Sequence, residues 1–250
     1  MTAKEIIAYM ESLKNEEQRR ILMGFFKTGP GEYGEGDEFL GLKVPQTREV
    51  VAASDITLDE IPTLLMSKWH EVRLCGLLIL VAKFEKLAKK RLENNEAAIK
   101  GRDEILTMYL QYVEQANNWD LVDLSVHKIL GHWLLLPSSL GDKDYKQKVL
   151  DELAASDCLW KQRMSMVCTW KTSQMGDPSW CLRYAGIHLH HPHDLMHKAV
   201  GWMLREMGKR CSMELLRDFL RQHAHEMPRT MLRYAIEKMS EQERQYWMTK

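Results

Sequence analysis

Apolar residues recur at spacings of three and four along most of the chain. The pattern is clearest over residues 6–13, 72–81 and 195–204. This spacing places apolar side chains on one face of an α-helix, whereas the strict alternation typical of strands is nearly absent. Six prolines stand at the starts of these stretches or in the turns between them: Pro45, Pro62, Pro137, Pro178, Pro192 and Pro228. The pattern predicts an all-α protein.

Several of the expected helices open with similar residues, which indicates an internal repeat. Similar openings occur at 69–73, 159–163, 196–199 and 231–234. Aligning them places five residues in one column, spaced by 50, 40, 35 and 35: Arg73, Asp123, Arg163, Lys198 and Arg233. This is the period of HEAT-like helix pairs, which stack into a curved solenoid with a concave groove. We therefore expect one solenoid domain over residues 1–250, with this column near the starts of the inner helices.

The charges are balanced overall but unevenly distributed. Residues 1–156 carry 20 basic and 25 acidic groups, whereas residues 157–250 carry 15 basic and 10 acidic groups and seven of the ten histidines. Either the C-terminal part faces an anion, or the excess is a coincidence of solvated Arg and Lys. A basic groove with exposed indoles would suit a phosphate backbone. Candidate wall residues are Trp119 and Trp202, then Trp160 and Trp170, with core packing as the alternative for each.

The cysteines and the hydropathy pattern argue against a disulfide-bonded, secreted or membrane-spanning protein. The five cysteines are scattered and form no C-x-x-C pair, so we expect reduced thiols that pack as small apolar groups. There is no signal-peptide pattern, and no apolar run approaches 18 residues. We expect a soluble, cytoplasmic protein with no membrane partner.

The stretch from Asn117 to Asp123 places two acids and an indole on the opening turns of an apolar helix. Residues four apart share a helix face, so Trp119 and Asp123 point the same way. A carboxylate on an apolar face is costly unless it is paired or functional. With Asn117 or Asn118 as the N-cap, Asp120 fits a first-turn acid favoured by the helix dipole, on a different face from Asp123. Asp123 lies one turn deeper and is the stronger functional candidate.

Four segments together resemble the AlkD-like family of DNA alkylation repair glycosylases, over almost the whole chain. They are Gly31–Pro45 followed by Arg48, Asn118–Asp123, Trp160-x-x-Arg163 with Lys171, and His193–Glu206 continued by Met227–Ala235. The resemblance implies a HEAT-like α-solenoid that wraps duplex DNA in a basic groove. It also implies hydrolysis of the N-glycosidic bond of cationic alkylpurines, such as 7-alkylguanine and 3-alkyladenine. Unlike most base-excising enzymes, the family does not require the base to be flipped into a pocket.

The resemblance also implies roles for individual residues. The catalytic aspartate falls on Asp123, and the two lesion-side tryptophans fall on Trp119 and Trp202. DNA contacts fall on Arg163, Lys171 and Tyr33, and the repeat column and basic excess add Lys198, Arg205 and Arg233. We expect a monomeric, monofunctional enzyme that needs no metal or other cofactor and no Schiff-base lysine.

A histidine cluster offers a competing interpretation as a zinc site. It comprises His188, His190, His191, His193 and His197, and its last two members are four residues apart. However, Pro192 and Asp194 place His193 before a helix, and no third ligand is evident. We interpret the cluster as solvated or phosphate-facing histidines.

Two further alternatives concern the glycine-rich loop and the class of function. The loop from Gly29 to Gly41 lacks a G-K-[ST] ending and follows no strand, so we interpret it as a mobile flap and not a P-loop. The alternative function is a non-catalytic HEAT-like scaffold that binds DNA or another protein. The combination of Trp119, Asp123 and Trp202 favours catalysis.

Overall fold

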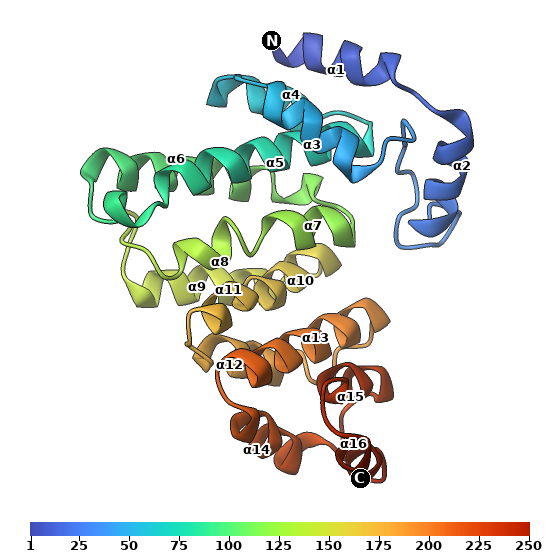
Figure 1. The fold of residues 1–250 in the computed structure, drawn as a ribbon, viewed down its shortest axis with the longest axis vertical. Coiled ribbons are helices and arrows are strands. Elements are labelled where there is room, and N and C mark those ends of the chain that lie inside the picture. The colour runs from blue at the N-terminus through green and yellow to red at the C-terminus, as the bar shows by residue number, and fades with distance from the viewer. The chain divides into compact units, whose positions relative to one another are not determined.

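The computed structural model describes residues 1–250 and confirms the all-α prediction, with helical pairs consistent with a helical-repeat solenoid (Figure 1). An isolated bridge between Glu38 and Trp69 is its only β-type pairing. The chain divides into two compact units, Met1–Ser125 and Val126–Lys250. None of the helices has the length and apolarity that a membrane span requires. The expectation of one domain over 1–250 stays a prediction.

The first unit is organised around α5 (His70–Leu87), which packs against α3, α4, α6 and α7. Every residue from His70 to Val81 is buried. A helix that is apolar on all sides is stable only in a protein interior, and here its neighbours surround it. The other helices of this unit are α1 (Ala3–Ser12), α2 (Glu16–Phe25), α3 (Val44–Ala53), α4 (Ile61–Leu65), α6 (Glu96–Gln111) and α7 (Trp119–Ser125), with short 3-10 helices at Leu58–Glu60, Lys90–Leu92 and Val113–Gln115.

The second unit is organised in the same way around α13 (Asp194–Arg210), which packs against α10, α11, α12, α14 and α15. Its core face includes Met196, Val200, Met203, Leu204 and Met207, all buried, at the three- and four-residue spacing of an amphipathic helix. The other helices are α8 (Leu130–Trp133), α9 (Lys143–Ala154), α10 (Leu159–Val167), α11 (Thr169–Gln174), α12 (Ser179–Ile187), α14 (Met213–His223), α15 (Arg229–Ile236) and α16 (Glu241–Met248).

The repeat column predicted from the sequence does fall near helix starts. Asp123, Arg163, Lys198 and Arg233 are each the fifth residue of their helix, and Arg73 is the fourth residue of α5. The five residues therefore lie near helix starts, as expected, and their placement on the inner helices of a solenoid stays a prediction. The side chains of the column nevertheless differ in environment, since two of its arginines, Arg73 and Arg163, are buried.

The cysteines are unpaired and buried or half-buried, as expected. Burial raises the pKa of the Cys75 and Cys181 thiols to about 12. Both thiols are therefore neutral at physiological pH and pack as apolar groups.

The close approach of α13 and α15 depends on Gly201. A Cβ at this position would lie 2.3 Å from the Met231 carbonyl oxygen, which belongs to the backbone of α15 and cannot rotate away. Gly186 in α12 is the matched control, because a Cβ there would meet nothing within 4 Å.

We predict that Gly201→Ala lowers the free energy of unfolding by roughly 1–3 kcal/mol through overpacking. Gly186→Ala should instead raise it by up to about 1 kcal/mol, since alanine is the better helix former. Urea unfolding followed by circular dichroism measures both. Equal effects of the two substitutions would show that the α13–α15 contact is not tight at Gly201.

Candidate active site

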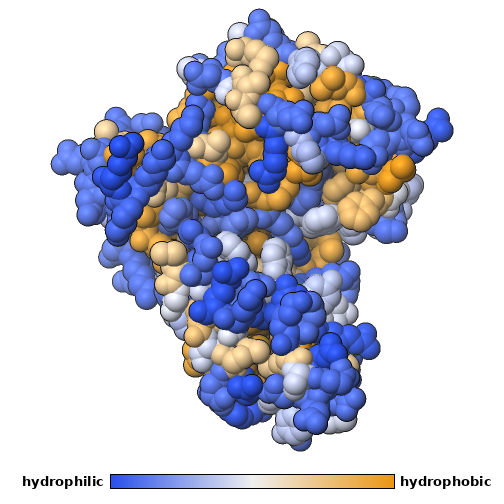
Figure 2. Space-filling view, in the orientation of Figure 1, coloured by the Kyte–Doolittle hydropathy of each residue, from blue (hydrophilic) through white to orange (hydrophobic).

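The first unit contains a cavity of about 480 Å³ between α2, α3, α5, α7 and the loop that joins α2 to α3. This volume is within the range of small-molecule sites. Aromatic and aliphatic side chains form most of its wall, and the carboxylates of Asp120 and Asp123 belong to the same wall. Apolar side chains of α2, which forms part of the cavity wall, are also exposed to solvent: Phe25 is 59% exposed and Ile21 is 58% exposed. Figure 2 shows apolar surface gathered over the first unit.

A stack of rings forms the aromatic wall. The Phe26 ring stacks on Trp119 with centroids 5.2 Å apart and on Phe39 at 5.1 Å, and Phe25 meets Trp119 edge-on at 5.8 Å. Trp119 is half-buried, so it packs against Phe26 while also lining the cavity. The structure thus brings Trp119 and Asp123 to one cavity wall, beside three phenylalanines that the sequence analysis did not single out.

Asp120 lies in the first turn of α7, as expected, but its expected placement on a different helix face from Asp123 was wrong. The side-chain oxygen of Asn118 accepts the Trp119 amide at 2.9 Å. The Asp120 side chain is buried, and its Oδ2 lies 2.9 Å from Nε2 of His70 on α5. Residues three apart on a helix are neighbours on one face, so Asp120 and Asp123 line the same cavity instead of pointing to different faces.

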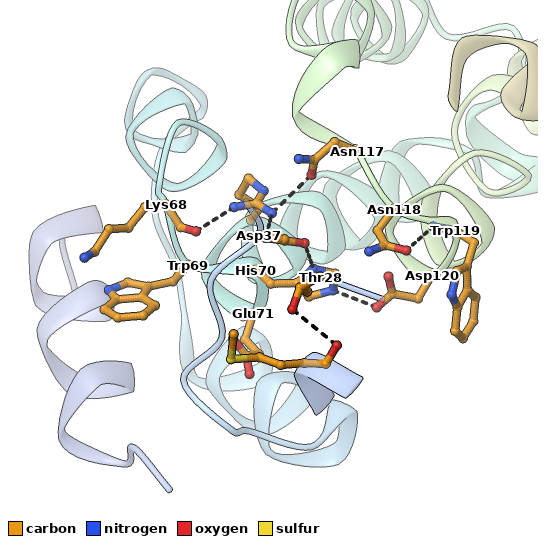
Figure 3. A network of polar contacts seen from close by, with 12 residues as sticks. Thr28, Asp37, Lys68, Trp69, His70, Glu71, Asn117, Asn118, Trp119 and Asp120 are labelled. Atoms are coloured by element: carbon orange, nitrogen blue, oxygen red, sulfur yellow. Dashed lines mark hydrogen bonds and ion pairs between the residues drawn. The ribbon is translucent and has the colours of Figure 1, made fainter. Parts of the chain in front are cut away.

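His70 and Arg73 join Asp120 to the α2–α3 loop through a buried polar network (Figure 3). His70 Nδ1 lies 2.7 Å from Asp37 Oδ2, so Asp37 and Asp120 occupy opposite sides of the imidazole. Arg73 donates to the other oxygen of Asp37 at 2.5 Å and to the side-chain oxygen of Asn117 at 3.1 Å. The network connects three segments that surround the cavity.

The two carboxylates set the protonation state of His70. Burial by itself would lower the pKa of His70, but Asp120 and Asp37 outweigh it and raise the pKa from 6.5 to about 9. For Asp37, burial favours the neutral acid, yet the hydrogen bond from His70 and the charge of Arg73 bring its pKa below the ordinary value. His70 is therefore an imidazolium at neutral pH, and both ring nitrogens donate.

Glu71 anchors the α2–α3 loop. Its buried carboxylate accepts the backbone amides of Leu40 at 2.9 Å, Gly41 at 2.9 Å and Leu42 at 3.0 Å. With Asp37 also bound to α5, residues 37–42 are fixed to the helix start. The interpretation of Gly29–Gly41 as a mobile flap was wrong for this second half of the loop, because its backbone groups are held by a buried charge.

The sequence analysis missed the network, although one signal was present. His70, Glu71 and Arg73 are three ionisable residues at the start of the most apolar stretch of the chain. Charged groups on a fully buried helix must find partners. That argument could have been applied to them as it was to Asp123, but it would not have identified Asp37 and Asp120 as the partners.

The remaining site candidates belong mostly to the second unit, which carries 19 of the 35 basic and 14 of the 35 acidic residues. Trp202 is half-buried on α13, and Arg233 is exposed on α15. Lys171 is half-buried and donates to the side chain of Gln174 at 3.0 Å. In the first unit Tyr33 is half-buried in the α2–α3 loop.

Three of the predicted DNA-binding residues make bonds within their own unit. Arg163 is only 5% exposed and donates to the Leu195 carbonyl at 2.6 Å. Lys198 forms an ion pair with Asp194 at 2.7 Å. Arg205 pairs with Glu206 and Glu237. A role of these cations in binding DNA stays a prediction.

The histidine cluster builds the turn between α12 and α13. His193 is the N-cap of α13 and accepts the Leu195 amide at 3.1 Å, which confirms that it precedes the helix. His197 donates to the His191 carbonyl, and buried His188 bonds to Ser165 Oγ at 2.8 Å. Burial lowers the pKa of His188 to about 4, so its ring is neutral. The interpretation as solvated or phosphate-facing groups was wrong for the buried His188, and no group of three or more His, Cys, Asp or Glu side chains is arranged to hold a metal.

Comparison with known proteins gives a family. The model of the DNA alkylation repair enzyme family matches residues 6–239. A solved structure described as a predicted DNA alkylation repair enzyme from Enterococcus faecalis superposes with a TM-score of 0.62, covering 91% of this chain and 97% of that one at 12% identity, which shows a shared fold. Comparison with curated proteins gave no match. Because the family model spans nearly the whole sequence, this chain belongs to the DNA alkylation repair enzyme family.

Proposed function

We propose that the protein is a monofunctional DNA glycosylase that hydrolyses the N-glycosidic bond of cationic alkylpurines in duplex DNA, including 7-alkylguanine and 3-alkyladenine. The observation that carries the proposal is the shared cavity wall of Asp123 and Trp119, in a chain of the DNA alkylation repair family. A carboxylate beside an indole is suited to a reaction that develops positive charge.

The proposed chemistry needs only residues of this chain. An alkylated purine already carries positive charge, so it departs as a neutral base without a strong acid. Its departure leaves an oxocarbenium-like sugar. The Asp123 carboxylate stabilises that cation and orients the attacking water. The indoles of Trp119 and Trp202 attract the cationic sugar or base with about 0.5–2 kcal/mol each.

This division of roles does not require base flipping. Asp123 acts on the sugar, and the leaving base needs no proton donor in a pocket. The base can therefore stay in the stack during hydrolysis, in contrast to enzymes that read an extruded base. No metal, nucleotide or redox cofactor takes part in the proposed reaction, and the protein acts as a monomer on DNA in the cytoplasm.

The basic excess of the second unit supports the proposed partner. We assign the phosphate contacts to Arg163, Lys171, Lys198, Arg205 and Arg233, with Tyr33 contributing from the first unit. The second candidate function is a non-catalytic scaffold that binds DNA or protein. It is favoured by the intramolecular bonds of Arg163 and Arg205, since these bonds give both side chains a structural use.

We predict that Asp123→Asn slows release of 7-methylguanine by at least about 100-fold, the scale of one lost electrostatic stabiliser. Asparagine keeps the shape of the side chain but removes its charge, so folding and DNA binding should be retained. Chromatographic detection of free base from 7-methylguanine duplex measures the rate. Excision at the wild-type rate would exclude the proposed mechanism and favour the scaffold.

We predict that affinity for duplex DNA falls steeply with salt, because each phosphate contact releases counterions. Fluorescence anisotropy with a labelled duplex, at about 50 and about 200 mM salt, gives the slope of log affinity against log salt concentration. Replacing the exposed Arg233 by Gln should reduce the slope by about one. An affinity that does not change with salt would contradict binding through the basic residues of the second unit.

A further inference from the structure

His70 lies where three segments around the cavity meet: Asp37 on the α2–α3 loop, the start of α5, and Asp120 on α7 (Figure 3). We propose that His70 is a positioning residue, which fixes the first turn of α7 to α5 so that Trp119 and Asp123 stay on the cavity wall. This inference rests on the proposed function for its catalytic consequence, but the anchoring itself can be measured without any reaction.

The hydrogen bond to His70 is the only one that holds the Asp120 side chain. Asp120 Oδ2 accepts from His70, while Oδ1 is buried and has no partner. Without His70, the carboxylate would be buried with neither a hydrogen bond nor an adjacent opposite charge. The first turn of α7 would then shift until Asp120 reached water, or Asp120 would take up a proton; in both cases its link to α5 is lost.

A shift of this turn would move the proposed catalytic groups. α7 has only seven residues, and Trp119 and Asp123 lie on either side of Asp120 within little more than one turn. Trp119 also stacks on Phe26, so its displacement would open the aromatic wall. A misplacement of about 1 Å at a reacting group is enough to cost on the order of 100-fold in rate.

His70 can hold Asp37 and Asp120 at the same time only when its ring is protonated. Neutral imidazole has one N–H and can serve only one carboxylate, whereas imidazolium serves both. The charged groups facing the network are Asp37 from the loop, Asp120 from α7, and Arg73 and Glu71 from α5 itself. Arg73 is bound to Asp37 and Glu71 to three loop amides, so neither replaces His70 at Asp120. The remaining faces of the ring are covered by Phe26 and Phe39.

Two substitutions separate the two links of His70. In His70→Gln, the side-chain amide nitrogen can take the place of the histidine Nε2 and keep the bond to Asp120. In His70→Asn, the amide nitrogen can take the place of the histidine Nδ1 and keep only the bond to Asp37. His225→Gln is the matched control, because His225 is an exposed histidine of the second unit that lies outside the histidine cluster. The measurements are single-turnover excision from 7-methylguanine duplex, duplex affinity, and hydrogen exchange of residues 117–125 and 34–42.

His70→Asn should slow excision by about 10- to 100-fold with little change in duplex affinity, and should speed exchange in residues 117–125. His70→Gln should retain most of the excision rate and protection of 117–125, but speed exchange in residues 34–42. The control should match the wild type. The positioning role would be overturned if the two His70 variants lost excision rate equally. It would also be overturned if hydrogen exchange in residues 117–125 were unchanged in His70→Asn.

The pH dependence provides a second readout. The pKa of His70 is raised from 6.5 to about 9 in the folded protein. The pair of bonds to Asp37 and Asp120 therefore contributes fully below pH 6.5, and one of the two is lost as the pH rises through about 9. The wild-type excision rate, corrected for the enzyme-free reaction, should fall above this pH, and His70→Gln should lack this fall.

The same alkaline fall in His70→Gln would contradict the proposal. If the wild type releases no base at any pH, the proposed function is wrong. Exchange in residues 117–125 still decides whether His70 holds α7.

Discussion

The imidazolium of His70 lies between two buried carboxylates, and the arrangement of the first unit around the cavity depends on this contact. Asp37 and Asp120 come from segments more than 80 residues apart in the chain. Both carboxylates are buried, where a negative charge is costly. The positive charge of His70 compensates this cost, because its ring nitrogens lie 2.7 Å from Asp37 Oδ2 and 2.9 Å from Asp120 Oδ2. Removing one member of such a buried group leaves an uncompensated charge, which is why such changes cost more than the loss of a surface ion pair.

The rigidity of α5 makes this contact possible. Its first turns are surrounded by other helices, so His70, Glu71 and Arg73 project from a fixed frame. Glu71 binds three successive loop amides, and Arg73 binds Asp37. The loop between α2 and α3 is thereby held against α5, and it carries Phe39 to the cavity wall. The ionisable residues of α5 thus position the aromatic side chains as well as the acids.

The wall that results is suited to a cation. The half-buried Trp119 provides a ring face backed by the stack of Phe26 and Phe39, and Asp123 adds a carboxylate from α7. Ring faces attract positive charge, and a carboxylate in apolar surroundings stabilises it more strongly than one in water. The basic excess lies in the second unit, where it suits the opposite charge of a phosphate backbone. The proposed glycosylase uses both properties, one for the reaction and one for the substrate.

The sequence by itself determined the all-α class, the starts of the repeated helices, the family, and the placement of Trp119 and Asp123 on one side of a helix. These depend on local periodicity and on residues close together in the chain, which a single sequence displays directly. The tertiary structure alone decided that Asp120 faces the cavity, that Glu71 fixes the loop, and that His188 is buried against Ser165. Each of these depends on a partner from a distant segment, such as Asp37 for His70 or Ser165 for His188. The pairing of buried charges is set by packing in three dimensions, and nothing in the spacing of one segment specifies which distant group will neutralise it.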